Sequence, residues 1–299
     1  MHVDFAGSAA QVPGNINCTR SATRSAICYA MKALLDPDVP NNQGAFDAIE
    51  WTAPEGSIVN AAYPAAVANR AHTVQRIIDA IIGAMAKAIP TRVVAAANGA
   101  NTTAVFTGIR PGTNERYIYF ETLGGGFGGR ATKDGKDGVQ VHITNTSNLP
   151  VEVIEMEYPL FVESYGFETD SGGAGHFRGG LGLRRVIRPR GHRCTFSGSG
   201  ERFAHAPWGL FGGADGRPGS FQLRNAHGEL ERLANKPTAV EFAPEEAVII
   251  VTPGAGGYGA AAERATPAIA ADLASEKFSS AVISASYPAR AGNQVESHT

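Results

Sequence analysis

The sequence predicts an α+β protein in which two core helices lie on a mixed β-sheet and a β-rich C-terminal region follows. Two long segments carry apolar residues at helical spacing, and after Pro90 the pattern changes to the alternation that is typical of strands. Glycine and proline are also frequent, with 36 and 17 of 299 residues. This content favours tight turns and strands over long helices.

The two helices are the clearest elements. One is expected over residues 19–35, where alanines recur along one face and an Asp-Pro pair follows. The other has isoleucines at helical spacing over residues 74–89 and ends at Pro90. Such stripes are more typical of core packing than of cofactor binding, so both helices are predicted to be structural.

Strands are expected at the N-terminus, over residues 2–5, and in many segments after Pro90. In residues 139–144, apolar residues alternate with Gln140, His142 and Thr144, which leaves one face of that strand polar. The other expected strands cover residues 92–97, 117–123, 151–157, 183–187, 193–197, 240–242 and 248–252.

Glycine-rich segments separate these strands and are interpreted as connectors. The arginines that begin at Arg178 are expected to be solvated side chains of a hairpin connector, although their basic face could also dock a partner subunit. The expected organisation has three parts: residues 1–150 as the α+β part of one domain, residues 151–260 as its β-rich part, and residues 261–299 as a weakly helical or disordered tail.

Charge and composition exclude several classes of protein. Lys plus Arg number 26 and Asp plus Glu 28, so the chain lacks the positive excess of a nucleic-acid binder and the polybasic patch of a membrane-surface protein. No secretory segment or membrane-spanning stretch is recognised. The three cysteines form no CxxC motif, which indicates neither a disulfide framework nor a zinc ribbon and fits a cytoplasmic protein.

The glycine-rich segment after the strand at residues 117–123 is a candidate binding loop. It matches GxGxxG but leads into a loop rather than a helix, so a dinucleotide site is rejected. A small polar ligand can approach a bare glycine backbone closely, while a tight structural turn is an equally good interpretation. The predicted substrate-binding residues are Glu121, Gly124, Gly125, Gly126, Gly128, Gly129, Arg130 and Asn145.

His142 is the candidate catalytic residue. Its imidazole lies on the polar face of the expected strand, and imidazole transfers protons near neutral pH. A hydrogen-bonded strand histidine without a catalytic role is the alternative, and the sequence alone favours it. No HExxH motif or other closely spaced ligand set occurs, so no metal site is predicted in this chain.

A series of short motifs, in a fixed order, identifies a family. These motifs are Asp4-Phe-Ala-Gly-Ser8, Val12-Pro-Gly-Asn-Ile-Asn17, Gln75-Arg-Ile77, Glu121-Thr-Leu-Gly-Gly-Gly126, His142-Ile-Thr-Asn-Thr146, Asp170-Ser-Gly-Gly-Ala-Gly175, Ala206-Pro-Trp-Gly-Leu-Phe-Gly-Gly213 and Thr252-Pro-Gly-Ala-Gly-Gly-Tyr-Gly259. From Asp4 to about Glu263 the chain resembles the hydantoinase B/oxoprolinase family, which includes subunits of N-methylhydantoinase, 5-oxoprolinase and acetone-type carboxylases.

The resemblance implies a subunit of an ATP-dependent hydrolase that opens a cyclic amide. A hydantoinase A-type subunit would bind ATP and phosphorylate the amide oxygen, which removes amide resonance and creates a leaving group for metal-activated water. The complex would be a hetero-oligomer. No cofactor is expected in this chain; the divalent metal and ATP are expected elsewhere in the complex, because the family's metal-binding motifs belong to an N-terminal half that this sequence does not match.

Two alternatives remain open at this stage. The chain could belong to an acetone-type ATP-dependent carboxylase that acts on a ketone, or it could be a non-catalytic assembly remnant of the family. The chain is expected to be inactive without the missing half and the partner subunit. The resemblance does not decide which lactam, hydantoin or ketone is the substrate.

Overall fold

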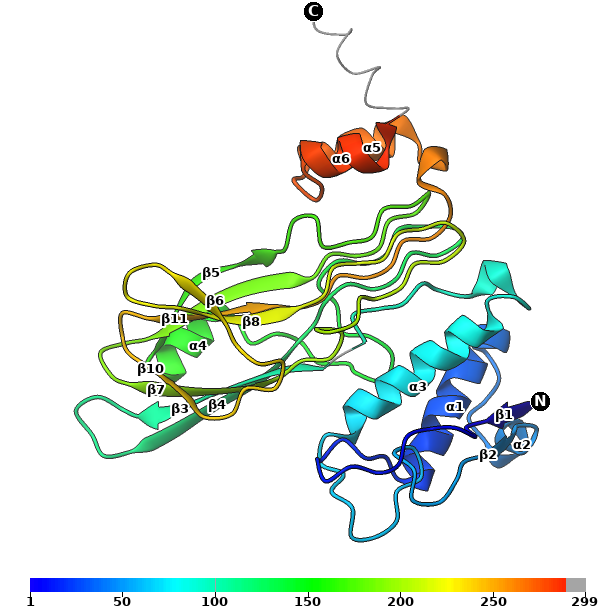
Figure 1. Ribbon diagram of the computed structural model, residues 1–299, viewed down its shortest axis with the longest axis horizontal. Helices are drawn as coiled ribbons and strands as arrows, with labels where there is room; N and C mark the ends of the chain where they lie inside the picture. Colours follow the sequence, from blue (N-terminus) through cyan, green and yellow to red (C-terminus); the bar gives the residue numbers. More distant parts are fainter. Residues whose placement is uncertain (100, 289–299) are drawn as a thin grey trace, which may run out of the picture. The chain divides into compact units, whose positions relative to one another are not determined.

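The computed structural model describes residues 1–99 and 101–288 and confirms the α+β class (Figure 1). The chain forms two compact units, Met1–Val93 and Val94–Thr299. The first is mainly helical, and the second holds the two larger sheets. The chain therefore divides after Val93, whereas the sequence analysis divided the domain at residue 150.

The first unit is built on two helices that pack against each other, α1 (Arg20–Leu35) and α3 (Arg70–Met85). The Thr19 side chain caps α1 by accepting a hydrogen bond from the Ala22 N–H. Alanines of α1 and isoleucines of α3 are buried, as their periodicity predicts. The remaining short helical elements of this unit are α2 (Gln43–Asp47) and η1 (Pro90–Arg92).

The expected N-terminal strand forms β1 (His2–Asp4), which pairs in parallel with β2 (Glu50–Thr52). Val3 lies opposite Trp51 in this ladder. The sequence analysis missed β2 because three residues are too few to display an alternating pattern. The pair forms a two-stranded sheet of its own.

Two antiparallel sheets form the core of the second unit, with strand orders β10-β7-β3-β4 and β5-β6-β11-β8-β9. Phe106 and Phe196 of the first sheet lie in one apolar cluster with Phe221 and Ile250 of the second, so the inner faces share a core. The strands are β3 (Thr102–Ile109), β4 (Arg116–Leu123), β5 (Leu160–Phe167), β6 (Leu183–Pro189), β7 (Cys194–Ser199), β8 (Ser220–Arg224), β9 (Leu230–Arg232), β10 (Val240–Phe242) and β11 (Ala247–Val251).

Three expected strands are wrong. Residues 92–97 and 139–144 are mostly extended or turning chain, and each contributes an isolated bridge. Residues 151–157 form a helix instead, α4 (Val151–Glu157), whose alternating valines and glutamates resemble a strand. The helix forms because the fully buried Ile154 anchors it in the core and its carbonyl accepts the Tyr158 N–H at 3.0 Å.

The glycine-rich connectors form a core of their own. Extended segments from distant parts of the sequence run side by side from the sheets toward the C-terminal helices (Figure 1) and bond through their backbones. The Gly173 N–H donates to Ala255 O at 2.8 Å, and the Gly257 N–H donates to Ala214 O at 2.9 Å. A Cβ on Gly179 would collide with the Ala255 carbonyl. Glycine is therefore required here by close backbone approach, not by turning.

The C-terminal part is ordered over its described residues, contrary to the expected tail. It forms η2 (Ala261–Glu263), α5 (Thr266–Ala274) and α6 (Ser280–Ser286), and Phe278 and Tyr287 are buried to 0% and 1% exposure. The rest of the expected tail, residues 289–299, lies outside the described residues.

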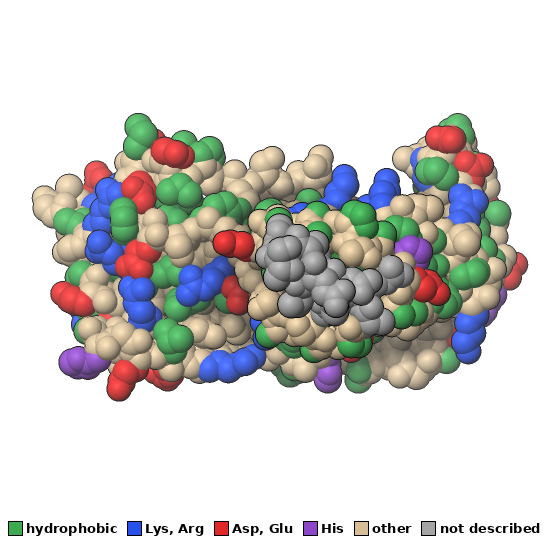
Figure 2. All heavy atoms as spheres, turned by 90° about the horizontal axis from the view of Figure 1, so that it is seen from above, with side chains coloured by type: hydrophobic (Ala, Val, Ile, Leu, Met, Phe, Trp, Pro, Cys, Tyr) green, Lys and Arg blue, Asp and Glu red, His purple; other side chains and the backbone are tan. Residues whose placement is uncertain are grey.

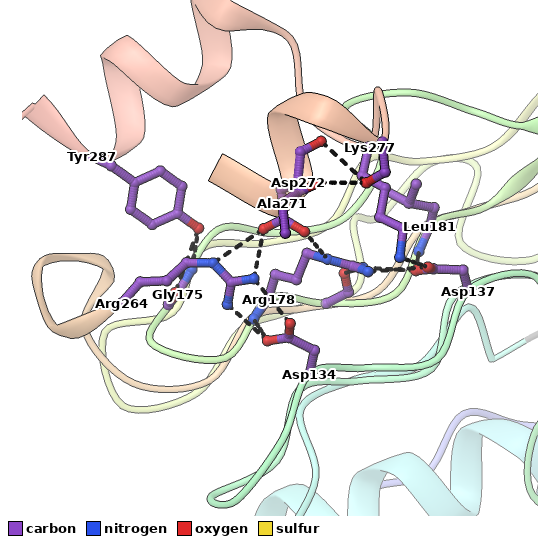
Figure 3. Close-up of polar contacts among 12 residues, drawn as sticks. Asp134, Asp137, Gly175, Arg178, Leu181, Arg264, Ala271, Asp272, Lys277 and Tyr287 are labelled. Carbon is purple, nitrogen blue, oxygen red and sulfur yellow. Dashed lines mark hydrogen bonds and ion pairs between the residues drawn. The ribbon is translucent and has the colours of Figure 1, made fainter. Parts of the chain in front are cut away.

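A buried ion network joins α5 to the glycine-rich segments. Figure 3 shows Arg178 and Arg264 lying between Asp134, Asp137 and Asp272. The Arg178 side chain is 4% exposed, so the expectation of a solvated arginine is wrong. Burial alone would raise the pKa of Asp137, but the hydrogen bonds and charge of Arg178 outweigh it, and the pKa lies below its ordinary value.

Charges of both signs are interspersed over the face drawn in Figure 2, in keeping with the net charge of −2. Within the described part of the chain, no helix combines the length and the apolar character needed to cross a membrane.

Candidate functional site

The candidate site lies where β4 ends and the loop of residues 124–130 begins. Three segments meet at this loop. The Asn98 N–H donates to Gly126 O at 2.8 Å, and the Asn98 side-chain amide donates to the same oxygen at 3.1 Å. From the other side, Gly125 and Val139 exchange two backbone hydrogen bonds of 2.9 and 2.7 Å. The loop is therefore held on both sides by backbone.

The loop glycines are structural rather than open to a ligand. The N–H groups of Gly125, Gly126 and Gly129 donate to the carbonyls of other segments, so they cannot also stabilise an anionic oxygen. A Cβ on Gly124 or Gly128 would collide with the backbone of a neighbouring segment. The expectation of a bare, approachable glycine backbone is corrected accordingly: the second half of the chain fills that space.

His142 lies beside this loop, but on a turn and not on the expected strand. Its φ of 50° is in the left-handed region, which histidine adopts more readily than most residues. The His142 ring centroid is 6.0 Å from that of Phe127, the residue that interrupts the run of glycines. The predicted loop and the predicted catalytic histidine are thus brought together through an aromatic side chain.

Polar side chains hold the turn around His142. Thr144 Oγ1 bonds to Asn101 Oδ1 at 2.7 Å, just before β3, and the Gln140 amide donates to Thr122 O at 3.1 Å, near the end of β4. The sequence analysis did not select Asn101 or Phe127. An aromatic residue within a glycine run was the available signal for Phe127, whereas nothing local distinguishes Asn101. Asn145, predicted to bind substrate, is exposed.

Arg130 completes the site at the far end of the loop. Its guanidinium lies over the Phe127 ring at 5.5 Å from the centroid. The side chain is half-buried, and its Nε has no hydrogen-bond partner among the described residues. Burial lowers the pKa of Arg130 from its ordinary value. A guanidinium with an unused donor is suited to an anionic oxygen.

Glu121 belongs to the core of the sheets and not to this site. Its carboxylate is buried and pairs with Arg185, whose side chain is 0% exposed, and the Tyr119 hydroxyl donates to it. Burial, and then the charge of Glu121, raises the pKa of Tyr119 far above its ordinary value. Arg185 shares one face of β6 with Leu183 and Ile187, and this alternation could have revealed its burial.

Across residues 1–99 and 101–288, no three His, Cys, Asp or Glu side chains come together in a way that could hold a metal ion. The metal that the family resemblance implies does not fit the described residues of this chain, so no reaction step below passes through it.

A protein-family model described as hydantoinase B/oxoprolinase matches residues 1–261. Among curated relatives, an uncharacterised protein of Methanocaldococcus jannaschii, MJ0963, is 40% identical over 278 residues, which are 93% of this chain and 48% of that protein. The B-type subunit of a putative D-/L-hydantoinase from a Pseudomonas species is 32% identical and shares 90% of this chain and 46% of its own length. The chain therefore spans about half the length of these relatives.

Two solved structures are similar to this chain. An ATP-dependent caprolactamase from Pseudomonas jessenii superposes with a TM-score of 0.85 and 26% identity, covering 96% of this chain and 51% of that one. A nucleotide-free acetone carboxylase shares the fold, with a TM-score of 0.75 and 18% identity over 96% of this chain and 43% of its own.

Proposed function

Because the chain belongs to the hydantoinase B/oxoprolinase family, we propose that it is one part of an ATP-dependent hydrolase that opens a cyclic amide. The likeness to caprolactamase carries the proposal, since caprolactam is a cyclic amide and the identity of 26% accompanies a TM-score of 0.85. The relative named as a B-type hydantoinase subunit supports an A-type, ATP-binding partner in a hetero-oligomer. We place this complex in the cytoplasm, in keeping with three free thiols.

The chemical difficulty of this reaction is amide resonance, which makes a lactam carbonyl a poor electrophile. We propose that the partner subunit uses ATP to phosphorylate the amide oxygen, and that ATP and a divalent metal are held elsewhere in the complex. The described residues of this chain then have two tasks: to move a proton as the ring opens, and to bind the anionic oxygens that the reaction produces.

His142 is the proposed proton carrier. The turn held by Asn101 and Gln140 presents its imidazole next to Phe127, where it protonates the leaving nitrogen or positions water. Arg130 binds an anionic oxygen through the donor that no described residue uses. The loop glycines keep Phe127 and Arg130 in place, and the exposed Asn145 meets the substrate at the edge of the site.

Reconstitution with the A-type subunit and the remaining half of the enzyme tests this proposal. With 5-oxoproline, hydantoin and caprolactam as candidate substrates, ring opening and phosphate release are measured together. His142→Ala should lower coupled hydrolysis on the order of 100-fold without loss of folding. His227→Ala, in the exposed turn after β8, is the matched control and should retain activity. Full activity of His142→Ala would remove the histidine from the mechanism.

Two results would replace the proposed reaction itself. ATP consumption that requires bicarbonate and a ketone would assign the chain to the carboxylase branch, with which the acetone carboxylase comparison shares the fold. A complex that assembles but turns over none of these substrates would indicate the assembly role.

A further inference from the structure

We propose that β1, α1 and α2 form a docking surface for another polypeptide segment: the part of the family protein that the matched relatives carry outside their shared region. This segment would add a strand to the open edge of β1 and cover the groove beside it. The proposal concerns an interface within the first unit, so it does not depend on the proposed reaction.

The backbone of β1 offers a vacant edge. The Glu50 N–H donates to Met1 O at 2.9 Å, and the Phe5 N–H donates to Thr52 O at 3.0 Å. Because alternate residues of a parallel strand bond to the same neighbour, Met1, Val3 and Phe5 face β2. The N–H and C=O groups of His2 and Asp4 therefore point away from β2, toward the side where the described residues supply no strand.

A two-stranded parallel sheet is an unusual end state. Two strands alone are marginally stable in water, and parallel sheets are normally covered on both faces. Here each strand has three residues, and both outer residues of each strand are exposed. β1 and β2 are more consistent with part of a wider sheet than with a complete one.

An apolar groove adjoins this edge within the same unit. One hollow of about 790 Å³ runs along α1 and is lined by Cys28, Tyr29 and Phe46 among others. Cys28 and Phe46 also line a second hollow of about 330 Å³, which Met1 and Ile49 connect to the two strands. Tyr29 and Leu35 remain 36% and 45% exposed beside it, which is a large apolar area for a free surface.

The occupant follows from the lengths of the relatives. This chain corresponds to 48% of the M. jannaschii protein and 51% of the caprolactamase chain, so each has a further half that this chain does not match. An extended strand with apolar side chains from that half would satisfy the edge of β1 and fill the groove together. A second copy of this chain is the competing occupant, and the experiment separates the two.

Cys28 reports directly on occupancy of the groove. It is half-buried, whereas Cys18 and Cys194 are buried, so it should be the first thiol to be alkylated. Burial raises the pKa of the Cys28 thiol, and the reaction with iodoacetamide is therefore followed at alkaline pH. The probe is the unmatched half of the M. jannaschii relative, co-expressed with this chain or joined to it by a flexible linker where it is insoluble alone.

The expected result is co-purification together with a slowing of Cys28 alkylation on the order of tenfold. Cys28→Ser identifies the modified site by removing the signal. Failure to associate in both formats, or association with Cys28 alkylated at its free rate, would overturn the proposal. Slowing that rises with the concentration of this chain alone, with a dimer in sedimentation, would assign the surface to a second copy and also overturn it.

The edge of β1 is tested by a matched pair of variants. His2→Pro removes an N–H that points away from β2, while His2→Ala keeps it. Loss of one interface hydrogen bond should weaken binding of the probe by about fivefold to tenfold in the proline variant relative to the alanine variant. Equal binding of the two variants would exclude strand addition at β1.

Discussion

The helix pair of the first unit and the glycine-rich core of the second are held together in opposite ways. α1 and α3 meet through side chains, with Ile78 at 0% exposure. In the glycine-rich core, backbones meet with no side chain between them, and hydrogen bonds such as Gly129 N–H to Gly256 O at 2.9 Å replace side-chain packing. A side-chain core adjusts to a small change of volume, whereas two backbones in contact cannot.

The largest expected effect is a methyl group between two of these backbones. Gly179→Ala places a Cβ against the Ala255 carbonyl, so the segments must separate and their hydrogen bonds break. We expect loss of more than about 3 kcal/mol of stability or failure to fold, measured by urea unfolding and solubility. Gly166→Ala in β5 is the control, because no atom lies within 4 Å of its added Cβ. A stable Gly179→Ala protein would show that the glycine-rich core is loosely packed.

The ion network should produce the next largest effect. Arg264→Met removes the partner of Asp134 and Asp272 from a site where the arginine side chain is 2% exposed. Leaving buried carboxylates unpaired should cost about 3–5 kcal/mol in urea unfolding. Arg193→Met breaks an ion pair whose side chains are 68% and 72% exposed and should cost less than about 1 kcal/mol. Equal losses in the two variants would mean that burial of the network contributes nothing.

Acid should weaken the second unit through the same network. Asp137 has a folded pKa below its unfolded value of 3.8. Its contribution to stability is therefore complete above pH 3.8 and is lost as the pH falls through the lower, folded pKa. Asp137→Asn should be less stable at neutral pH, with a flatter decline of unfolding free energy in acid. An unchanged acid slope would assign the decline to other carboxylates.

The smallest effect is expected in the helix pair. Ile78→Val removes one methylene from the contact of α3 with α1 and should cost about 0.5–1.5 kcal/mol without altering the fold. Thermal unfolding of this variant beside Gly179→Ala, which adds one carbon rather than removing one, measures the contrast between the two kinds of core. A larger loss for Ile78→Val would reverse the comparison.

Local sequence patterns predicted what depends on local structure. The isoleucine period located α3, and the alternation at residues 117–123 located β4. The same reasoning failed for α4, because its alternating valines satisfied the strand pattern while burial of Ile154 selected the helix. At the candidate site, the sequence selected the glycine loop and His142, but the turn that presents His142 depends on Asn101, 43 residues from its partner Thr144.

By itself, the sequence determined the two helices, most strands of the sheets and the family of the chain, because each leaves a pattern within a short window or a motif. Only the tertiary structure decided which glycines separate backbones and which arginines are buried. Arg264 bonds to Asp134, 130 residues away, and Arg185 reads from sequence like any surface arginine until β4 brings Glu121 to it. Burial of a charge or of a bare backbone is a property of the partner segment, and no local pattern records where that partner will lie.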